Sequence, residues 1–162
     1  MVTVRLAEDP LKNPGPLQFG RAPDGATPRD RPAAFAVVVR DGKVAAAFIT
    51  RSDGTYTDLP GGALEDGEDD AAACVREFGE ETGLVIRPLR LLGRASQFLR
   101  TVDGEQVNNR CALFEAECVG EDPALKIEAD HALQWLYPHE ALRVLRHDAH
   151  AWAVLAWMRA RG

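Results

Sequence analysis

The sequence predicts an α/β fold in which helices pack against a mixed β-sheet. The first observation is a pair of near-continuous apolar runs, residues 33–39 and 44–50, joined by Asp41-Gly42. Asp-Gly between such runs is typical of a β-hairpin, and runs without polar alternation are typical of strands covered on both faces. The second observation is an amphipathic helix pattern at residues 70–82, with strand patterns on either side and helix patterns at the end of the chain. This order of elements indicates an α/β sandwich.

Length and composition fit one domain spanning residues 1–162. A chain of 162 residues with 46% hydrophobic content can bury a single core. The 25 acidic residues outnumber the 19 basic ones, which gives a net charge of −6, and no block of Lys and Arg forms a stripe. A nucleic-acid polymer is therefore not an expected partner. A small phosphate ester that arrives with its own magnesium ion stays compatible with the acidic balance.

The N-terminal region predicts a short strand at residues 2–6 followed by an extended loop. Residues 9–32 contain six of the ten prolines and three glycines, a composition that excludes regular helix. The N-terminus lacks the apolar core of a signal peptide, and no uncharged run is long enough to cross a bilayer. We therefore expect a cytoplasmic protein without membrane contact. The proline-rich segment either covers its own domain or reaches a second copy, which leaves a homodimer open.

The central helix is predicted with both of its ends. Before it, a short extended piece at residues 56–58 leads into Leu59-Pro60-Gly61-Gly62, which forces a sharp turn with exposed backbone. Asp69 is a suitable N-cap and Gly83 a suitable C-terminal cap. The apolar stripe comprises Ala71, Cys74, Val75, Phe78 and Thr82. The opposite side comprises Arg76, Glu77, Glu80 and Glu81.

The elements after this helix follow from apolar runs and turn signals. The expected strands span residues 85–92, 95–99, 111–118 and 133–137. The expected helices span residues 138–145 and 149–161. In the last helix, Trp152, Leu155 and either Val154 or Met158 are expected to point inward. His147 and His150 have the spacing of metal ligands, but no further His or Cys pair completes a zinc site, so a helix start with Asp148 as N-cap is favoured.

Three glutamates on the central helix predict a divalent metal. Glu77, Glu80 and Glu81 are helix-surface neighbours, so their mutual repulsion weakens the helix unless a cation lies among them. Hard divalent metals prefer oxygen ligands, and proteins hold magnesium beside a substrate phosphate in this way. A solvated acidic face is the alternative, but it explains neither the glycine turn nor the lack of lysine among the glutamates. Phosphate chemistry is therefore the leading interpretation.

The same helix carries a family signature. Gly62, Glu68, Arg76-Glu77-Phe78, Glu80-Glu81 and Gly83-Leu84 match every fixed position of G-x5-E-x7-R-E-U-x-E-E-x-G-U, where U is a bulky aliphatic residue. By these residues the chain resembles the Nudix hydrolases, as a small MutT-like member. Phe78 is the one departure, because an aliphatic side chain is usual there. The resemblance spans about residues 33–162 and implies an α/β/α sandwich around a mixed sheet.

The resemblance implies an enzyme that cuts a pyrophosphate bond with Mg²⁺, for which Mn²⁺ substitutes. It implies that Glu77, Glu80 and Glu81 bind the metal together with the backbone carbonyl of Gly61, and that one of the glutamates takes a proton from the attacking water. Arg76 is implied to be held by carboxylates, with Glu68 as its partner. A module that binds nucleotides without cleaving them usually lacks one of these carboxylates, and here none is missing.

Substrate contacts are expected from residues outside the signature. Tyr56 and Phe98 flank the expected cleft and are candidates to stack on a nucleobase. Arg94, Arg100 and Arg110 are candidate phosphate contacts. The resemblance also implies an extra carboxylate, as metal ligand or general base, from the acidic stretch before Trp135, where Glu128 and Asp130 are the candidates. A solvated loop is the alternative for these two residues.

Marks of several subfamilies are absent from the segment after the signature. Leu99 and Arg100 stand where the ADP-ribose type has a proline, and Thr101 and Val102 stand where the diadenosine polyphosphate type has a tyrosine. NADH-cleaving members have a characteristic array of residues in this segment, and this chain matches only the first two positions of that array. A nucleoside or deoxynucleoside triphosphate is therefore the leading substrate. A diphosphate conjugate such as a nucleotide sugar or dinucleotide, and a non-catalytic nucleotide-binding module, are the alternatives.

Overall fold

The computed structural model describes residues 17–162, so the strand expected at 2–6 and the first part of the proline-rich segment lie outside the described residues. The strands, in chain order, are β1 (Leu17–Phe19), β2 (Arg29–Arg40), β3 (Lys43–Arg51), β4 (Gly54–Asp58), β5 (Gly61–Ala63), β6 (Leu84–Arg100), β7 (Gln106–Glu121) and β8 (His131–Leu136). The helices are α1 (Asp70–Thr82), α2 (Pro138–Val144), α3 (Asp148–Arg159) and a 3-10 turn at Pro123–Leu125.

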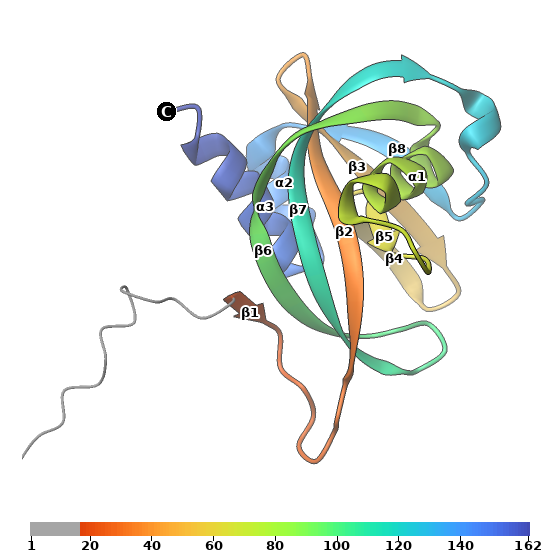
Figure 1. Cartoon of the computed structure of the whole chain (residues 1–162), viewed down its shortest axis with the longest axis vertical. Coiled ribbons are helices and arrows are strands. Elements are labelled where there is room, and N and C mark those ends of the chain that lie inside the picture. The colour runs from red at the N-terminus through yellow and green to blue at the C-terminus, as the bar shows by residue number, and fades with distance from the viewer. Residues whose placement is uncertain (1–16) are drawn as a thin grey trace, which may run out of the picture.

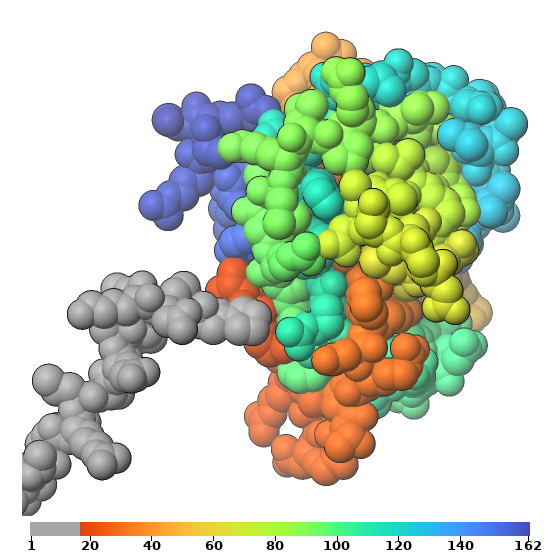
Figure 2. Space-filling view, viewed as in Figure 1, coloured from red at the N-terminus to blue at the C-terminus, as the bar shows by residue number. Residues whose placement is uncertain are grey.

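The strands form a mixed sheet, which confirms the predicted fold class. Its order is β1-β6-β7-β2-β3-β4, with β5 paired to β2 and β8 paired to β3. β2 runs parallel to β7 but antiparallel to β3 and β5. Helix α1 packs on β2, β5 and β6, whereas α3 packs on β2, β6 and β7 from the other side of the sheet (Figure 1). Figure 2 shows α1 and the loop before it on the right-hand part of the front face, with the end of α3 exposed at the opposite edge.

β2 divides the interior into two hydrophobic cores. Ala33, Phe35 and Val37 contribute to the core under α2 and α3, whereas their neighbours Ala34 and Ala36 contribute to the core under α1. Successive side chains of a strand point to opposite faces, so an unbroken apolar run is required when both faces are covered. The hairpin that follows turns at Asp41-Gly42, where both residues have positive φ, as a two-residue hairpin turn of this type requires.

The limits of α1 agree with its predicted caps. The side chain of Asp69 accepts a hydrogen bond from the backbone N–H of Ala72 at 2.7 Å, and Gly83 ends the helix with a φ of 76°. Both ends were predictable because capping depends on residues adjacent in sequence. The buried residues of the helix, however, include Glu81, which was predicted on the side opposite the apolar stripe.

Several strands differ from their predicted ranges. β2 begins at Arg29, inside the segment expected to be a loop, because its first residues pair in parallel with β7 from Val107 onward. β1 also lies in that segment and pairs with β6. The two strands expected at 85–92 and 95–99 are one strand, β6, whose ladder to β7 is interrupted by register shifts, the last between Leu91 and Gly93. Gly93 leaves room for Trp152, since a Cβ there would lie 2.5 Å from the indole ring.

The last helix differs from its prediction at its start and on its buried face. His147 is the N-cap and Asp148 is the first helical residue, so the assignment of Asp148 as N-cap was wrong. Val154 is buried, whereas Leu155 and Met158 are exposed, because α3 presents Ala149, His150 and Ala153 to the sheet. Within residues 17–162, no helix combines the length and the apolar character needed to cross a membrane.

Candidate active site

The turn between β4 and β5 brings backbone against the buried end of α1. Gly61 has a φ of 147°, and a Cβ at this position would lie 2.2 Å from the carbonyl oxygen of Ala34, so only glycine fits. The backbone N–H of Gly61 donates to Oε2 of Glu81 at 3.4 Å. The sharp turn predicted from Leu59-Pro60-Gly61-Gly62 therefore serves to position Gly61 beside a glutamate of the signature.

Glu81 is a buried carboxylate that no Lys or Arg of residues 17–162 pairs with. It is 7% exposed, and Nε2 of His131 lies 3.7 Å from its Oε1. Burial raises the pKa of Glu81 well above its ordinary value, and the charge of Glu77 raises it further. An anion in this position is stabilised by a bound cation, so the site is suited to a metal ion.

Arg76 connects the loop before α1 with the other two glutamates. Its guanidinium donates two bonds of 2.8 Å to Glu68, one of 2.7 Å to Glu77 and one of 3.3 Å to Glu80. A further bond of 3.0 Å reaches the carbonyl oxygen of Ala63 in β5. These contacts lower the pKa of Glu68 to about 2, chiefly through the hydrogen bonds from Arg76. The ion pair expected between Glu68 and Arg76 is thus present and fixes loop, strand and helix relative to one another.

Glu77 lies against the glycine turn. A Cβ on Gly62 would lie 2.5 Å from Oε2 of Glu77, so the missing side chain leaves room for the carboxylate. Burial raises the pKa of Glu77, an effect that the hydrogen bond from Arg76 opposes. The structure therefore brings Glu77 and Glu81 to the first residues of β5, and Arg76 connects Glu80 to Glu77.

A cavity of about 210 Å³ lies beside this cluster, and Gly61, Gly62 and Glu81 form part of its wall. The other lining residues come from strands and loops far apart in sequence. Those with cationic or imidazole side chains are Arg31, Arg51, Arg100, Arg146, His131, His147 and His150. The carboxylate cluster thus borders a cavity with four guanidinium groups in its wall, and guanidinium groups are complementary to phosphate groups.

Comparison with known proteins identifies the family. Residues 30–158 match the family model of the NUDIX domain. The chain belongs to the Nudix family. Among solved structures, it is similar to a NUDIX hydrolase from Nitrosomonas europaea, with 23% identity and a TM-score of 0.69 over 82% of this chain and 90% of that one.

Two further solved structures are similar to this Nudix chain at slightly higher identity. The ORF135 protein of E. coli is 26% identical, with a TM-score of 0.60 over 83% of this chain and 93% of that one. The MutT NUDIX hydrolase from Burkholderia pseudomallei is also 26% identical, with a TM-score of 0.57 over 79% of this chain and 98% of that one. The Nudix family supports a hydrolase that acts on pyrophosphate bonds of small molecules and generally uses a divalent metal.

The acidic stretch before Trp135 lies next to the signature helix of this Nudix domain. The backbone N–H groups of Ile127 and Glu128 both donate to the carbonyl oxygen of Glu80. Ligand atoms of Glu128, Asp130 and His131 lie within 4.8 Å of one another, a spacing that a metal ion could bridge. Asp130 also accepts a hydrogen bond of 3.2 Å from Arg51, and His131 donates or accepts at 2.8 Å from Asp130.

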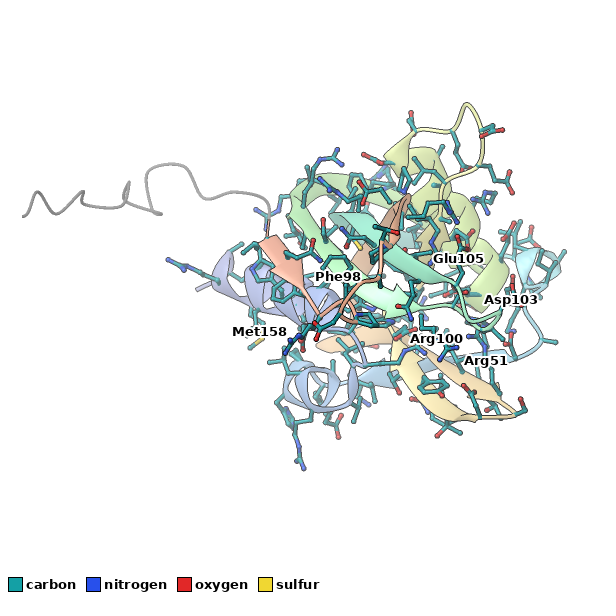
Figure 3. The ribbon with its side chains drawn as sticks, turned by 90° about the horizontal axis from the view of Figure 1, so that it is seen from below. Arg51, Phe98, Arg100, Asp103, Glu105 and Met158 are labelled. Carbon is teal, nitrogen blue, oxygen red and sulfur yellow. The ribbon has the colours of Figure 1, made fainter. Side chains whose placement is uncertain are left out.

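The structure separates the other predicted substrate contacts. Arg100 lines the cavity, and Tyr56 lines a neighbouring one, where the guanidinium of Arg146 covers its ring at 4.4 Å. Phe98 lines neither cavity and lies toward β1, whereas Arg51 and Arg100 lie close together (Figure 3). Arg94 and Arg110 are on the surface, paired with Asp70 and Asp30. Phe98, Arg94 and Arg110 are therefore not brought to the site.

Sequence reasoning missed three arginines of the cavity and the place of His147 and His150 in its wall. Arg31, Arg51 and Arg146 belong to no local motif, and they meet only in the folded structure. His147 and His150 were noted only for their spacing. Both face Asp58 at the end of β4, at 3.9 and 4.0 Å, and burial lowers the pKa of His150 to about 3. They thus form part of the cavity wall as neutral side chains.

Proposed function

We propose that this protein is a Mg²⁺-dependent hydrolase that cleaves a pyrophosphate bond in a nucleoside or deoxynucleoside triphosphate. The observation that carries the proposal is that Glu81 and Gly61 line a cavity that is also lined by four arginines. Carboxylates that suit a hard cation thus border guanidinium groups that suit phosphate oxygens. This juxtaposition is the one that hydrolysis of a phosphoric anhydride requires.

The donor set fits a hard divalent ion, because Glu81 is buried beside Glu77 and no guanidinium of the described part of the chain is bonded to it. We propose Glu77, Glu80, Glu81 and the carbonyl of Gly61 as the ligands of Mg²⁺ or Mn²⁺, which when bound neutralises phosphate oxygens and activates the attacking water. We propose that Glu128 and Asp130 lie at the open edge of the same metal site.

The side chains of this chain then have distinct roles. Glu81 accepts the proton of the attacking water at a carboxylate oxygen, since it is the glutamate of the cluster that lines the cavity. The water oxygen forms a bond to phosphorus while the bridging phosphorus–oxygen bond breaks, which releases a nucleoside monophosphate and pyrophosphate. Arg76 and Glu68 are positioning residues, because they hold Glu77 and Glu80 without lining the cavity. Tyr56 contributes by supporting Arg146.

The test is product formation from a panel of nucleoside triphosphates, nucleotide sugars and dinucleotides, with and without Mg²⁺. We expect monophosphate and pyrophosphate from triphosphates in the presence of Mg²⁺, and a loss of at least about a hundredfold in kcat for Glu81→Gln and Glu80→Gln. Glu117→Gln is the matched control, since Glu117 pairs with Arg87 on the surface between β6 and β7. Its kcat should equal that of the wild type.

Metal binding has an independent readout in thermal stability. At a Mg²⁺ concentration about a hundred times its Kd, the melting temperature of the wild type should rise by roughly 5–10 °C, and that of Glu80→Gln much less. An equal rise in both proteins would mean that the metal does not bind at this helix. If the wild type and the variants were equally inactive towards the whole panel while one nucleotide bound tightly, the protein would be a nucleotide-binding module and not a hydrolase.

A further inference from the structure

Four arginines line the cavity, but only two of them are neutralised by a carboxylate. Arg146 donates to both carboxylate oxygens of Asp58, and Arg51 donates to Asp130 at 3.2 Å. Arg31 instead donates to the amide oxygen of Asn109 at 2.8 Å, and Arg100 to the backbone carbonyl of Gly104 at 3.3 Å. Within residues 17–162, neither Arg31 nor Arg100 has a carboxylate within ion-pair distance. Arg31 and Arg100 are therefore the two arginines of the cavity that have no ion-pair partner among these residues.

Keeping the Arg31 guanidinium without a carboxylate partner costs free energy of folding. Its side chain is half-buried in β2, and burial lowers its pKa, although the guanidinium stays protonated at neutral pH. A desolvated cation without an anionic partner gains more from an incoming anion than an exposed one does. The arrangement is thus poised for a ligand that brings several negative charges.

The cationic surface extends beyond the first cavity. A second cavity, of about 380 Å³, shares Arg51, Arg100 and Arg146 with the first and is also lined by the carboxylates of Asp53 and Asp103. Figure 3 shows Arg51 and Arg100 side by side, with Asp103 near them. The positive groups thus form a run that starts beside Glu81 and leads outward, a shape that suits an extended chain of phosphates rather than a single anion.

No aromatic face is free for a nucleobase along this run. Among the described residues that line the first cavity, Phe35 is the sole Phe, Tyr or Trp; it is 6% exposed, and the ring of His150 lies 4.3 Å from it. In the second cavity, Tyr56 is covered by Arg146. Stacking between a base and an aromatic ring supplies much of the affinity in sites that recognise bases. The cavity lacks that means of recognition.

We infer that Arg31, Arg51, Arg100 and Arg146, the arginine channel, bind the substrate by a linear chain of at least three phosphates and leave the nucleobase unread. The inference rests on the proposed hydrolase activity and narrows it. The enzyme accepts triphosphates of any base and discriminates by the number of phosphates. Diphosphate conjugates with a single pyrophosphate bond fill too little of the channel to be good substrates.

Two measurements test this inference. The first is kcat/KM for ATP, GTP, CTP and UTP against the four diphosphates, where we expect the bases to differ by less than about fivefold and each triphosphate to exceed its diphosphate by at least about tenfold. The second is calorimetric binding of inorganic tripolyphosphate, which has no base. We expect it to bind the wild type and to compete with all four triphosphates equally.

Substitutions of single arginines test whether the arginine channel causes these results. Arg31→Gln and the more exposed Arg100→Gln should each weaken tripolyphosphate binding, and raise KM equally for every base, by about tenfold to a hundredfold, as expected for a lost charged hydrogen bond. Arg87→Gln removes one positive charge from an exposed pair with Glu117 and should change neither. Measuring both variants guards against misfolding of Arg31→Gln.

The outcomes separate this inference from the proposed function. Hydrolysis that favours one base by a hundredfold or more, or tripolyphosphate that fails to bind, overturns the inference while the hydrolase stands. Unchanged KM and tripolyphosphate affinity in both variants also overturns it. Arginine-dependent binding of tripolyphosphate without turnover of any triphosphate supports the channel and overturns the hydrolase.

Discussion

A buried hydrogen bond joins His150 in α3 to the backbone of Leu59, whose N–H donates to Nδ1 of the imidazole at 3.2 Å. His150 is 2% exposed, and its ring packs on Phe35. Leu59 stands two residues before Gly61, whose own N–H donates to Glu81. A helix near the C-terminal end of the chain therefore fixes the turn on which the carboxylate site is built.

Replacement of His150 by leucine should destabilise the protein. The variant fills a similar volume but removes the acceptor of the Leu59 N–H, and a buried donor without a partner costs about 1–3 kcal/mol. His150→Asn, which keeps an acceptor near the position of Nδ1, should lose less. Urea unfolding measures both. If His150→Leu were as stable as the wild type, the bond to Leu59 would not hold the turn, and the account of the turn would be wrong.

The same histidine predicts a component of the pH dependence of stability. Burial lowers its pKa from the ordinary 6.5 to about 3, although Asp58 beside it acts in the opposite direction. Below pH 6.5 the unfolded chain takes up a proton that the folded chain refuses, so folding free energy is lost as the pH falls from 6.5 towards 3. A variant in which residue 150 does not titrate keeps the other groups that face this position, His147 and Arg146.

Unfolding of His150→Asn between pH 7 and pH 5 checks this component. The wild type should lose about 1–2 kcal/mol more than the variant over that interval, since each pH unit with one proton of difference corresponds to about 1.4 kcal/mol. Parallel losses in both proteins would show that the unfolded and folded chains protonate His150 alike, contrary to its burial.

The helix of the site was predictable because its information is local. Asp69 and Gly83 cap α1 through atoms within one helical turn, and the spacing of Glu77, Glu80 and Glu81 fixes them as neighbours on a helix. Their environments were not predictable. Glu81 is buried because β5 and β8 cover that edge of α1, and the pairing of those strands with β2 and β3 is a long-range property.

The substrate cavity was unpredictable for a related reason. Arg31 and Arg146 are 115 positions apart, and no spacing links them before the sheet forms. Phe98 was expected at the cleft, but its neighbour Leu99 lines the cavity instead. Side chains alternate along a strand, so each register shift in β6 changes which residues face the site, and the number of such shifts cannot be read from the sequence.

Gly62→Ala should reduce activity with little loss of stability. A Cβ at this position would lie 2.5 Å from Oε2 of Glu77 and 2.6 Å from its Cδ, at the far end of a flexible side chain. The backbone of Gly62 is not in the left-handed region, so alanine fits the chain itself. The strain is therefore expected to be relieved by movement of the Glu77 carboxylate, and displacement of about 1 Å at a reacting site can cost a hundredfold in rate.

Steady-state kinetics and urea unfolding of Gly62→Ala, together with Gly120→Ala, decide this point. Gly120 lies in β7, and the nearest atom to a Cβ added there is the Cβ of Val85, at an ordinary contact distance of 3.9 Å. This control should therefore retain wild-type kcat. For Gly62→Ala we expect kcat to fall by about tenfold to a hundredfold while the free energy of unfolding changes by less than about 1 kcal/mol. Wild-type kcat would mean that the position of Glu77 does not matter for catalysis. A large loss of stability would mean that the backbone of the turn yields before the carboxylate does.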